Sequence, residues 1–171
     1  MERRQALKNV LFSAAGLVTL PAWGNSWNIN SIQISDSVFN ANQVQILEIL
    51  VDALIPSSST PGAKDLEISA FINKMITDCY ETPVQESFII GLESSEKLAN
   101  ATFSKNLSAC DKIQRNDLLI KLSTSSDIQL KEFFTLLKQL TVLAYTTSEY
   151  VLTKHYNYVM APGHYYGCVN A

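Results

Sequence analysis

The chain has 171 residues, of which 47% are hydrophobic and 17% are charged, and its net charge is −3. This length is enough for one hydrophobic core, so we expect a single structural domain. A mean hydropathy of +0.06 argues against both a disordered chain and a multispanning membrane protein. With 13 basic and 16 acidic residues, the composition gives no support to nucleic acid as a partner.

Residues 1–24 have the pattern of a cleavable signal peptide. Three cations, Arg3, Arg4 and Lys8, precede a short apolar stretch that runs from residue 10 to residue 20. That stretch is shorter than the roughly 20 residues that a membrane-spanning helix needs. We therefore expect export to the periplasm, with cleavage near Gly24.

The paired arginines resemble the twin-arginine translocation signal. An apolar residue and Lys8 follow the pair, although Ala6 stands where that signal usually has a bulky Phe. The moderately apolar stretch that follows also suits this route. An ordinary Sec signal and an uncleaved amphipathic anchor helix are the alternatives.

Export would change the chemistry open to the three cysteines, because the periplasm is oxidising. Cys79, Cys110 and Cys168 all lie beyond the cleavage site. They allow three pairings, each of which leaves one cysteine over, and the sequence does not choose among them. Because the CxxC spacing of metal sites is missing, a disulfide is expected rather than a metal site.

The first helix is predicted to follow a linker. Residues 25–40 are polar and rich in Ser and Asn, as is typical of a linker. From Asn42 the apolar residues recur at three- and four-residue spacing, which predicts an amphipathic helix that ends before Pro56. Thr60 is a good N-cap and Pro61 a good first residue for the next helix.

Four more helical patterns follow that turn. One runs through residues 68–79, and Pro83 opens another that has Phe88 and Leu92 on its core face. Asp111 and Gln114 are a capping pair for a shorter helix.

The last pattern is the longest, from Asp127 to about Tyr158, with Ser125 or Ser126 as its cap. Its expected inner face consists of Leu130, Phe133, Phe134, Leu137, Leu140, Leu143 and Ala144. We therefore predict an all-α fold, a single-domain bundle of about five helices over residues 41–171. It would have a long C-terminal helix and an aromatic, turn-rich tail.

The sequence supplies no complete catalytic constellation, which would need a nucleophile with a base, paired carboxylates or a cofactor loop. His155 and His164 lack the spacing of metal ligands. Asp52 is expected to form a salt bridge or cap a turn, and Glu149 is the best candidate for a buried charge. We expect no catalytic, metal or cofactor-binding residue in this chain.

Three landmarks carry a family resemblance. They are the LIP and TPGA sequences between Leu54 and Ala63, the TSE triplet at residues 147–149, and the pattern Y-x-x-x-PG-x-Y-x-GC at residues 158–168. In this order, from about Asn42 onward, they resemble the gluconate 2-dehydrogenase subunit 3 family, the small subunits of membrane-associated, flavin-dependent sugar and sugar-acid dehydrogenases.

This resemblance implies a non-catalytic subunit. In such enzymes a large flavoprotein carries the FAD and oxidises the sugar or sugar acid, and a c-type cytochrome subunit often passes electrons to the membrane. The small subunit is expected to escort the folded flavoprotein through the twin-arginine pore and to stabilise it afterwards. The chain would then meet the membrane only through the complex.

The end of the chain is the first candidate for a partner interface, because tyrosine buries much area at low entropic cost. The candidate residues are Tyr156, Tyr158, Met160, Pro162, Tyr165 and Tyr166. Alternatively, this tail folds back and seals the bundle. The turn from Pro56 to Ala63 is the second candidate interface.

Two other functions remain open on the sequence. The chain could be a free-standing periplasmic helical protein that binds a small ligand, or an accessory subunit of a different redox enzyme.

Overall fold

The structure is a computed structural model that describes Gln5, residues 37–161 and Gly163. The compact unit that contains the helices begins at Ser37. Its regular elements are α2 (Ala41–Leu54), α3 (Ile68–Cys79), α4 (Thr82–Phe103), the 3-10 turn η2 (Leu107–Ala109), α5 (Lys112–Ser123), α6 (Ile128–Thr146) and α7 (Glu149–Lys154). Because the described part of the chain has only helices, the all-α prediction is confirmed.

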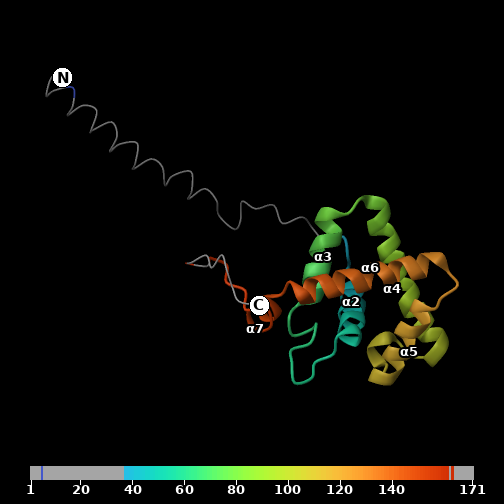
Figure 1. The fold of residues 1–171 in the computed structure, drawn as a ribbon. Coiled ribbons are helices and arrows are strands. Elements are labelled where there is room, and N and C mark those ends of the chain that lie inside the picture. Colours follow the sequence, from blue (N-terminus) through green and yellow to red (C-terminus); the bar gives the residue numbers. More distant parts are fainter. Residues whose placement is uncertain (1–4, 6–36, 162, 164–171) are drawn as a thin grey trace. The chain divides into compact units, whose positions relative to one another are not determined.

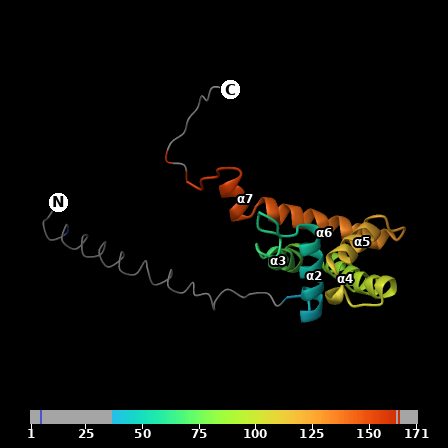
Figure 2. The same ribbon diagram turned by 90° about the horizontal axis from the view of Figure 1, so that it is seen from below.

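Helices α2 and α6 organise the bundle. Each of them packs against α3, α4 and α5 as well as against the other. Figures 1 and 2 show α6 running along the bundle, with α5 beside its first half and α7 at its far end. The last long helix is therefore central to the bundle.

Helix α2 begins at a capping box. The Asn40 side chain accepts a hydrogen bond from the Gln43 amide, and the Gln43 side chain accepts one from the Asn40 amide. Gln43 is 6% exposed, and its side-chain nitrogen donates to the carboxylate of Glu93 on α4 at 3.0 Å. These bonds satisfy helix-end donors that would otherwise lack partners.

The predicted linker extends too far. Phe39 is 5% exposed and stacks on Phe88 of α4, with 5.7 Å between the ring centroids. Phe88 in turn meets Phe133 of α6 edge to face at 5.0 Å. A buried aromatic residue of this kind contributes about 1.5–3 kcal/mol to stability. Residues 37–40 therefore belong to the folded unit, because Phe39 completes an aromatic column in its core.

The corner between α3 and α4 is held by one side chain. The amide nitrogen of Gln85 donates to the carbonyl oxygens of Ile76, Thr77 and Tyr80, at 2.9 to 3.1 Å. Those carbonyls lie at the C-terminal end of α3, where intrahelical partners run out. Pro83 lies in the first turn of α4, as predicted, where its missing N–H costs nothing.

Helix α4 approaches α6 closely through a small residue. A Cβ atom at Gly91 would collide with the ring and the Cβ of Phe133. Ser95, one turn further on, is fully buried, and its hydroxyl donates to the Gly91 carbonyl at 2.7 Å. Small side chains on this face of α4 therefore make room for a large aromatic side chain of α6.

The start of α5 confirms the predicted capping pair. The Asp111 carboxylate accepts from the Gln114 amide at 2.8 Å, and the Gln114 side chain accepts from the Asp111 amide at 3.1 Å. Leu118, Leu119 and Leu122 form the buried face of this helix. The amphipathic pattern and the cap thus agree on the same short helix.

The last long helix is shorter than predicted. It ends at Thr146, and α7 begins at Glu149 with Ser148 as its N-cap. The hydroxyls of Thr147 and Ser148 donate to the carbonyls of Leu143 and Tyr145, at 2.8 and 2.7 Å. Such side-chain bonds compete with the backbone bonds that would continue the helix, which explains the break.

The N-cap and the inner face of α6 differ from the prediction. Its N-cap is Asp127, which accepts from the Gln129 amide at 2.9 Å, whereas the Ser125 hydroxyl accepts from the Asp127 amide instead. Leu143, predicted to face inward, is 45% exposed. Leu143 lies on the solvent side of the last turn, whereas Ala144 and Tyr145 of the same turn pack against the core.

Candidate partner interface

The sequence predicted that a helix begins at Pro61, but the Pro56–Ala63 loop contains no helix start. Helix α3 begins only at Ile68. The carbonyl of Ile55 accepts from the Ala63 amide at 2.9 Å, which closes the loop at its base. Turns then continue to Glu67, which has a left-handed backbone with φ of 51° and caps α3 without a side-chain bond.

One carboxylate organises the loop. A single oxygen of Asp65 accepts from the Ser57 hydroxyl at 2.6 Å and from the Gly62 amide at 2.8 Å. The Ser57 bond, followed by the Gly62 bond, holds the pKa of Asp65 below its ordinary value, because both donors favour the charged carboxylate. Asp65 therefore joins the two ends of the loop while ionised.

Gly62 is required by close packing within the loop. A Cβ atom at this position would collide with the backbone and the hydroxyl of Ser57. Gly62 and Ala63 are buried, whereas the side chains of residues 56–59 are exposed. Gly62 and Ala63 thus form the inner side of the loop, and the three serines face solvent.

A hydrogen bond from α6 fixes the position of the loop. The hydroxyl of Tyr145 donates to the carbonyl oxygen of Pro61 at 3.0 Å. Tyr145 lies in the last turn of α6, just before the break that leads to α7. The loop is thereby held at the same end of the bundle as α7, and Figures 1 and 2 show the two side by side.

Helix α7 ends in an exposed aromatic segment. His155 is its C-cap and lies edge to face against Tyr150, with 5.8 Å between the ring centroids. Backbone bonds from Tyr156 and Tyr158 to Val151 and Leu152 turn the chain after the helix.

Of the predicted interface residues, Tyr156, Tyr158 and Met160 are 66%, 52% and 86% exposed. Pro162, Tyr165 and Tyr166 lie outside the described residues, and so does His164.

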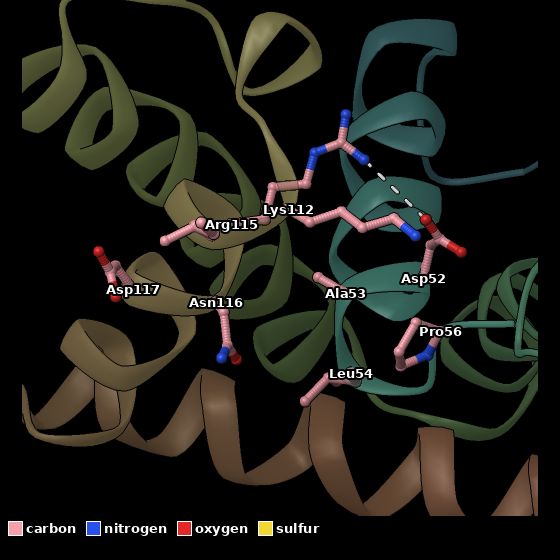
Figure 3. Close-up of a pocket in the computed structure, with 9 residues that line it drawn as sticks. Asp52, Ala53, Leu54, Pro56, Lys112, Arg115, Asn116 and Asp117 are labelled. Atoms are coloured by element: carbon pink, nitrogen blue, oxygen red, sulfur yellow. Dashed lines mark ion pairs between the residues drawn. The ribbon is translucent and has the colours of Figure 1, made fainter. Parts of the chain in front are cut away.

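A separate pocket lies between the end of α2 and the start of α5 (Figure 3). Its volume is about 480 Å³, and Ala53, Leu54, Pro56 and Ile113 form its apolar part. Its charged residues are Asp52, Lys112, Arg115 and Asp117. Because these charges are two of each sign, the pocket selects neither an anion nor a cation.

Asp52 forms the salt bridge that the sequence analysis allowed. Its carboxylate lies 3.9 Å from Nη1 of Arg115, and both side chains are partly exposed. The Arg115 guanidinium also donates to the Ser108 carbonyl at 3.3 Å. A pair this long and this exposed contributes little to stability, about 0–1 kcal/mol. Sequence reasoning missed Arg115, because its distance from Asp52 along the chain gave no signal.

The family model for gluconate 2-dehydrogenase subunit 3 matches residues 41–163. That range covers every described helix, from α2 to α7. The chain belongs to the gluconate 2-dehydrogenase subunit 3 family. No curated protein and no solved structure matches the chain.

Membership in the gluconate 2-dehydrogenase subunit 3 family places the chain among the accessory subunits of a multi-subunit dehydrogenase. Both candidate surfaces, the Pro56–Ala63 loop and the segment from Tyr156 to Met160, fall inside the matched range. The range ends at Gly163, so it stops before Cys168, which closes the last of the sequence landmarks.

The predicted cysteines and signal residues lie partly within and partly outside the residues that the structure describes. Cys79 is exposed and Cys110 is buried, and both are free thiols in the described part of the chain. Cys168, Arg3, Arg4 and Lys8 lie outside the described residues, so pairing with Cys168 and the signal stay predictions.

Three findings at the described residues concern a charged side chain, metal binding and membrane crossing. Glu149 is exposed in the first turn of α7, not buried as expected, because this short helix faces the bundle with Val151 instead. Across residues 37–161, no group of three or more His, Cys, Asp or Glu side chains is placed to hold a metal ion. No described helix combines the length and the apolar character that a membrane crossing requires.

Proposed function

We propose that this chain is the small, non-catalytic subunit of a periplasmic FAD-dependent sugar or sugar-acid dehydrogenase. The observation that carries the proposal is the family match over residues 41–163. In this role the chain binds the large flavoprotein, escorts it through the twin-arginine pathway and stabilises it afterwards. The FAD belongs to the large subunit, and a c-type cytochrome subunit completes the path of electrons to the membrane.

The escort role has a physical rationale. A flavoprotein that acquires FAD in the cytoplasm must cross the membrane folded, because unfolding would release the cofactor. One signal peptide on a bound partner is then enough for both chains. The sequence supports this by placing Arg3, Arg4 and Lys8 ahead of a short apolar stretch.

Co-expression tests the proposal directly. The full chain is produced with the flavoprotein of the dehydrogenase encoded beside it, in a host that has the twin-arginine machinery. We expect a stoichiometric complex in the periplasm that shows flavin absorbance and oxidises gluconate or a related sugar. Without the chain, the flavoprotein should stay in the cytoplasm.

Three results would contradict this function. A flavoprotein that reaches the periplasm unaided has no need of an escort. A colourless, solitary chain would instead favour the free-standing binding protein, and a stoichiometric partner without flavin would favour a different redox enzyme.

A further inference from the structure

The end of the bundle beyond α6 combines two exposed segments that are distant in sequence. The bond from Tyr145 to Pro61 holds the Pro56–Ala63 loop against the last turn of α6. Helix α7 starts after Ser148 and leads into the segment from Tyr156 to Met160. Figures 1 and 2 agree that the loop and α7 are neighbours. The fold thus brings the loop and the described part of the aromatic tail, up to Met160, to one place.

Four exposed side chains form the apolar part of this surface. Tyr156 and Tyr158 are 66% and 52% exposed, and Val159 and Met160 are 62% and 86% exposed. A fully covered aromatic side chain buries about 150–250 Å², so the four residues together offer roughly 500 Å². The largest apolar patch on a typical monomer is about 300–600 Å² and is often functional.

The chemistry of the surface is that of a protein interface. Tyrosine and methionine are enriched at the centres of interfaces, and charged residues are depleted there. Residues 156–160 carry no charged side chain, and the exposed hydroxyls of Ser57, Ser58 and Ser59 lie on the neighbouring loop. An apolar centre beside hydroxyl groups matches the core and rim of such interfaces.

The area decides between a second copy of the chain and a different partner. A symmetric dimer would use the same patch twice, which buries roughly 1,000 Å² in total. Stable interfaces bury about 1,200–2,000 Å². A larger partner can cover this patch and continue onto the flanking surface, so a heterologous partner fits better.

We propose that Tyr156, Tyr158, Val159 and Met160, together with residues 57–60 of the loop, form the docking surface for the large flavoprotein subunit. This inference rests on the proposed function and assigns the partner to one end of the bundle. The aromatic segment supplies the apolar contacts. The loop, held in place by Tyr145 and Asp65, supplies hydroxyl groups at their edge.

The test compares two triple variants of the full chain, each co-expressed with the flavoprotein. The first replaces Tyr156, Tyr158 and Met160 by Ser, on the proposed surface. The matched control replaces Ile90, Ile120 and Ile128 by Ser, which are 53%, 55% and 72% exposed on α4, α5 and α6. Thermal unfolding of both variants shows that each is folded. Affinity is measured by titration, with bound flavin as the readout.

We expect the Tyr156/Tyr158/Met160 variant to bind the flavoprotein at least ~100-fold more weakly, because interface centres carry most of the binding energy. The Ile90/Ile120/Ile128 variant should bind as the wild type does. Unchanged affinity of the first variant, with wild-type binding intact, would overturn the docking surface alone. Concentration-dependent dimers of the wild-type chain that only the first variant loses would assign the surface to self-association. A wild-type chain that binds no flavoprotein would overturn the proposed function as well.

Discussion

Tyr145 on α6 donates a hydrogen bond to the carbonyl oxygen of Pro61, a residue 84 positions earlier in the chain. Pro61 belongs to a loop with an exposed outer side, and Tyr145 stands two residues before the break between α6 and α7. The bond therefore ties the loop to the helix end from which the aromatic segment departs.

Replacing Tyr145 by Phe should reduce the free energy of unfolding by about 0.5–1.5 kcal/mol, the net contribution of a hydrogen bond of this kind. The Pro61 carbonyl loses its donor while the ring keeps its packing. Urea unfolding measures the change. The matched control is Tyr150→Phe, since the Tyr150 ring meets His155 by edge contact, which the substitution retains. Equal losses in the two variants would show that the Pro61 bond contributes nothing.

Asp65 gives the loop a dependence on acid. Because the bonds from Ser57 and Gly62 depress the pKa of Asp65 in the folded chain, the unfolded state binds its proton first as the pH falls. The stabilisation is complete above the unfolded pKa, near pH 4, and is lost as the pH falls through the lower folded value. Asp65→Asn should remove this contribution, so its stability should approach that of the wild type at low pH.

Ser57→Ala provides the companion measurement for that acid limb. It removes the largest cause of the depressed pKa, so the folded pKa of Asp65 should rise toward its ordinary value. The stabilising contribution then becomes smaller and is lost at higher pH. Unfolding curves between pH 7 and pH 2 follow all three proteins. An acid limb that is the same in the wild type and both variants would argue against the role of Asp65.

Replacing Gly91 by Ala should destabilise the bundle by about 1–3 kcal/mol, because the new Cβ would collide with Phe133. Alanine is the better helix former by about 1 kcal/mol, so a stabilised variant would show that α4 and α6 can separate freely. Gly163→Ala is the control, since a Cβ atom there meets nothing within 4 Å. Thermal unfolding of the two variants gives the comparison.

Replacing Arg3 and Arg4 by Lys should leave both the chain and its flavoprotein partner in the cytoplasm. The twin-arginine route needs the paired guanidinium groups, whereas a Sec signal needs only positive charge. Fractionation followed by a flavin spectrum measures the location of both proteins. Lys8→Arg keeps the charge and serves as the control. Unchanged export of both chains would exclude the twin-arginine route.

The helices themselves could be read from the sequence, because their signals are local. The apolar spacing of α2 and the Asp111–Gln114 capping box predicted two helices that the structure confirms. Where prediction failed, contacts between distant segments or competing side-chain bonds decided. The sequence pattern assigns Phe39 to a linker, whereas its ring stacks on Phe88 in the core. The predicted long helix ends early at Thr146 because threonine and serine hydroxyls bond the carbonyls of its last turn.

The candidate interface divides in the same way. The sequence alone was enough to choose Tyr156, Tyr158 and Met160 as interface candidates, since aromatic residues outside a helical pattern suit an interface. Their exposure could not be predicted in this way, because burial depends on what else packs against the segment. The same holds for the Pro56–Ala63 loop, whose place depends on a hydrogen bond from a helix far along the chain.

The sequence by itself determined the family, the helical class and the starts of α2, α4 and α5, because motifs, caps and apolar periods are properties of neighbouring residues. Tertiary structure alone decided that Asp65 and Tyr145 hold the loop at the α7 end of the bundle, and that Gly91 admits Phe133. Such pairings are selected by packing and hydrogen bonding between segments that share no local pattern, so they exist only once the chain has folded.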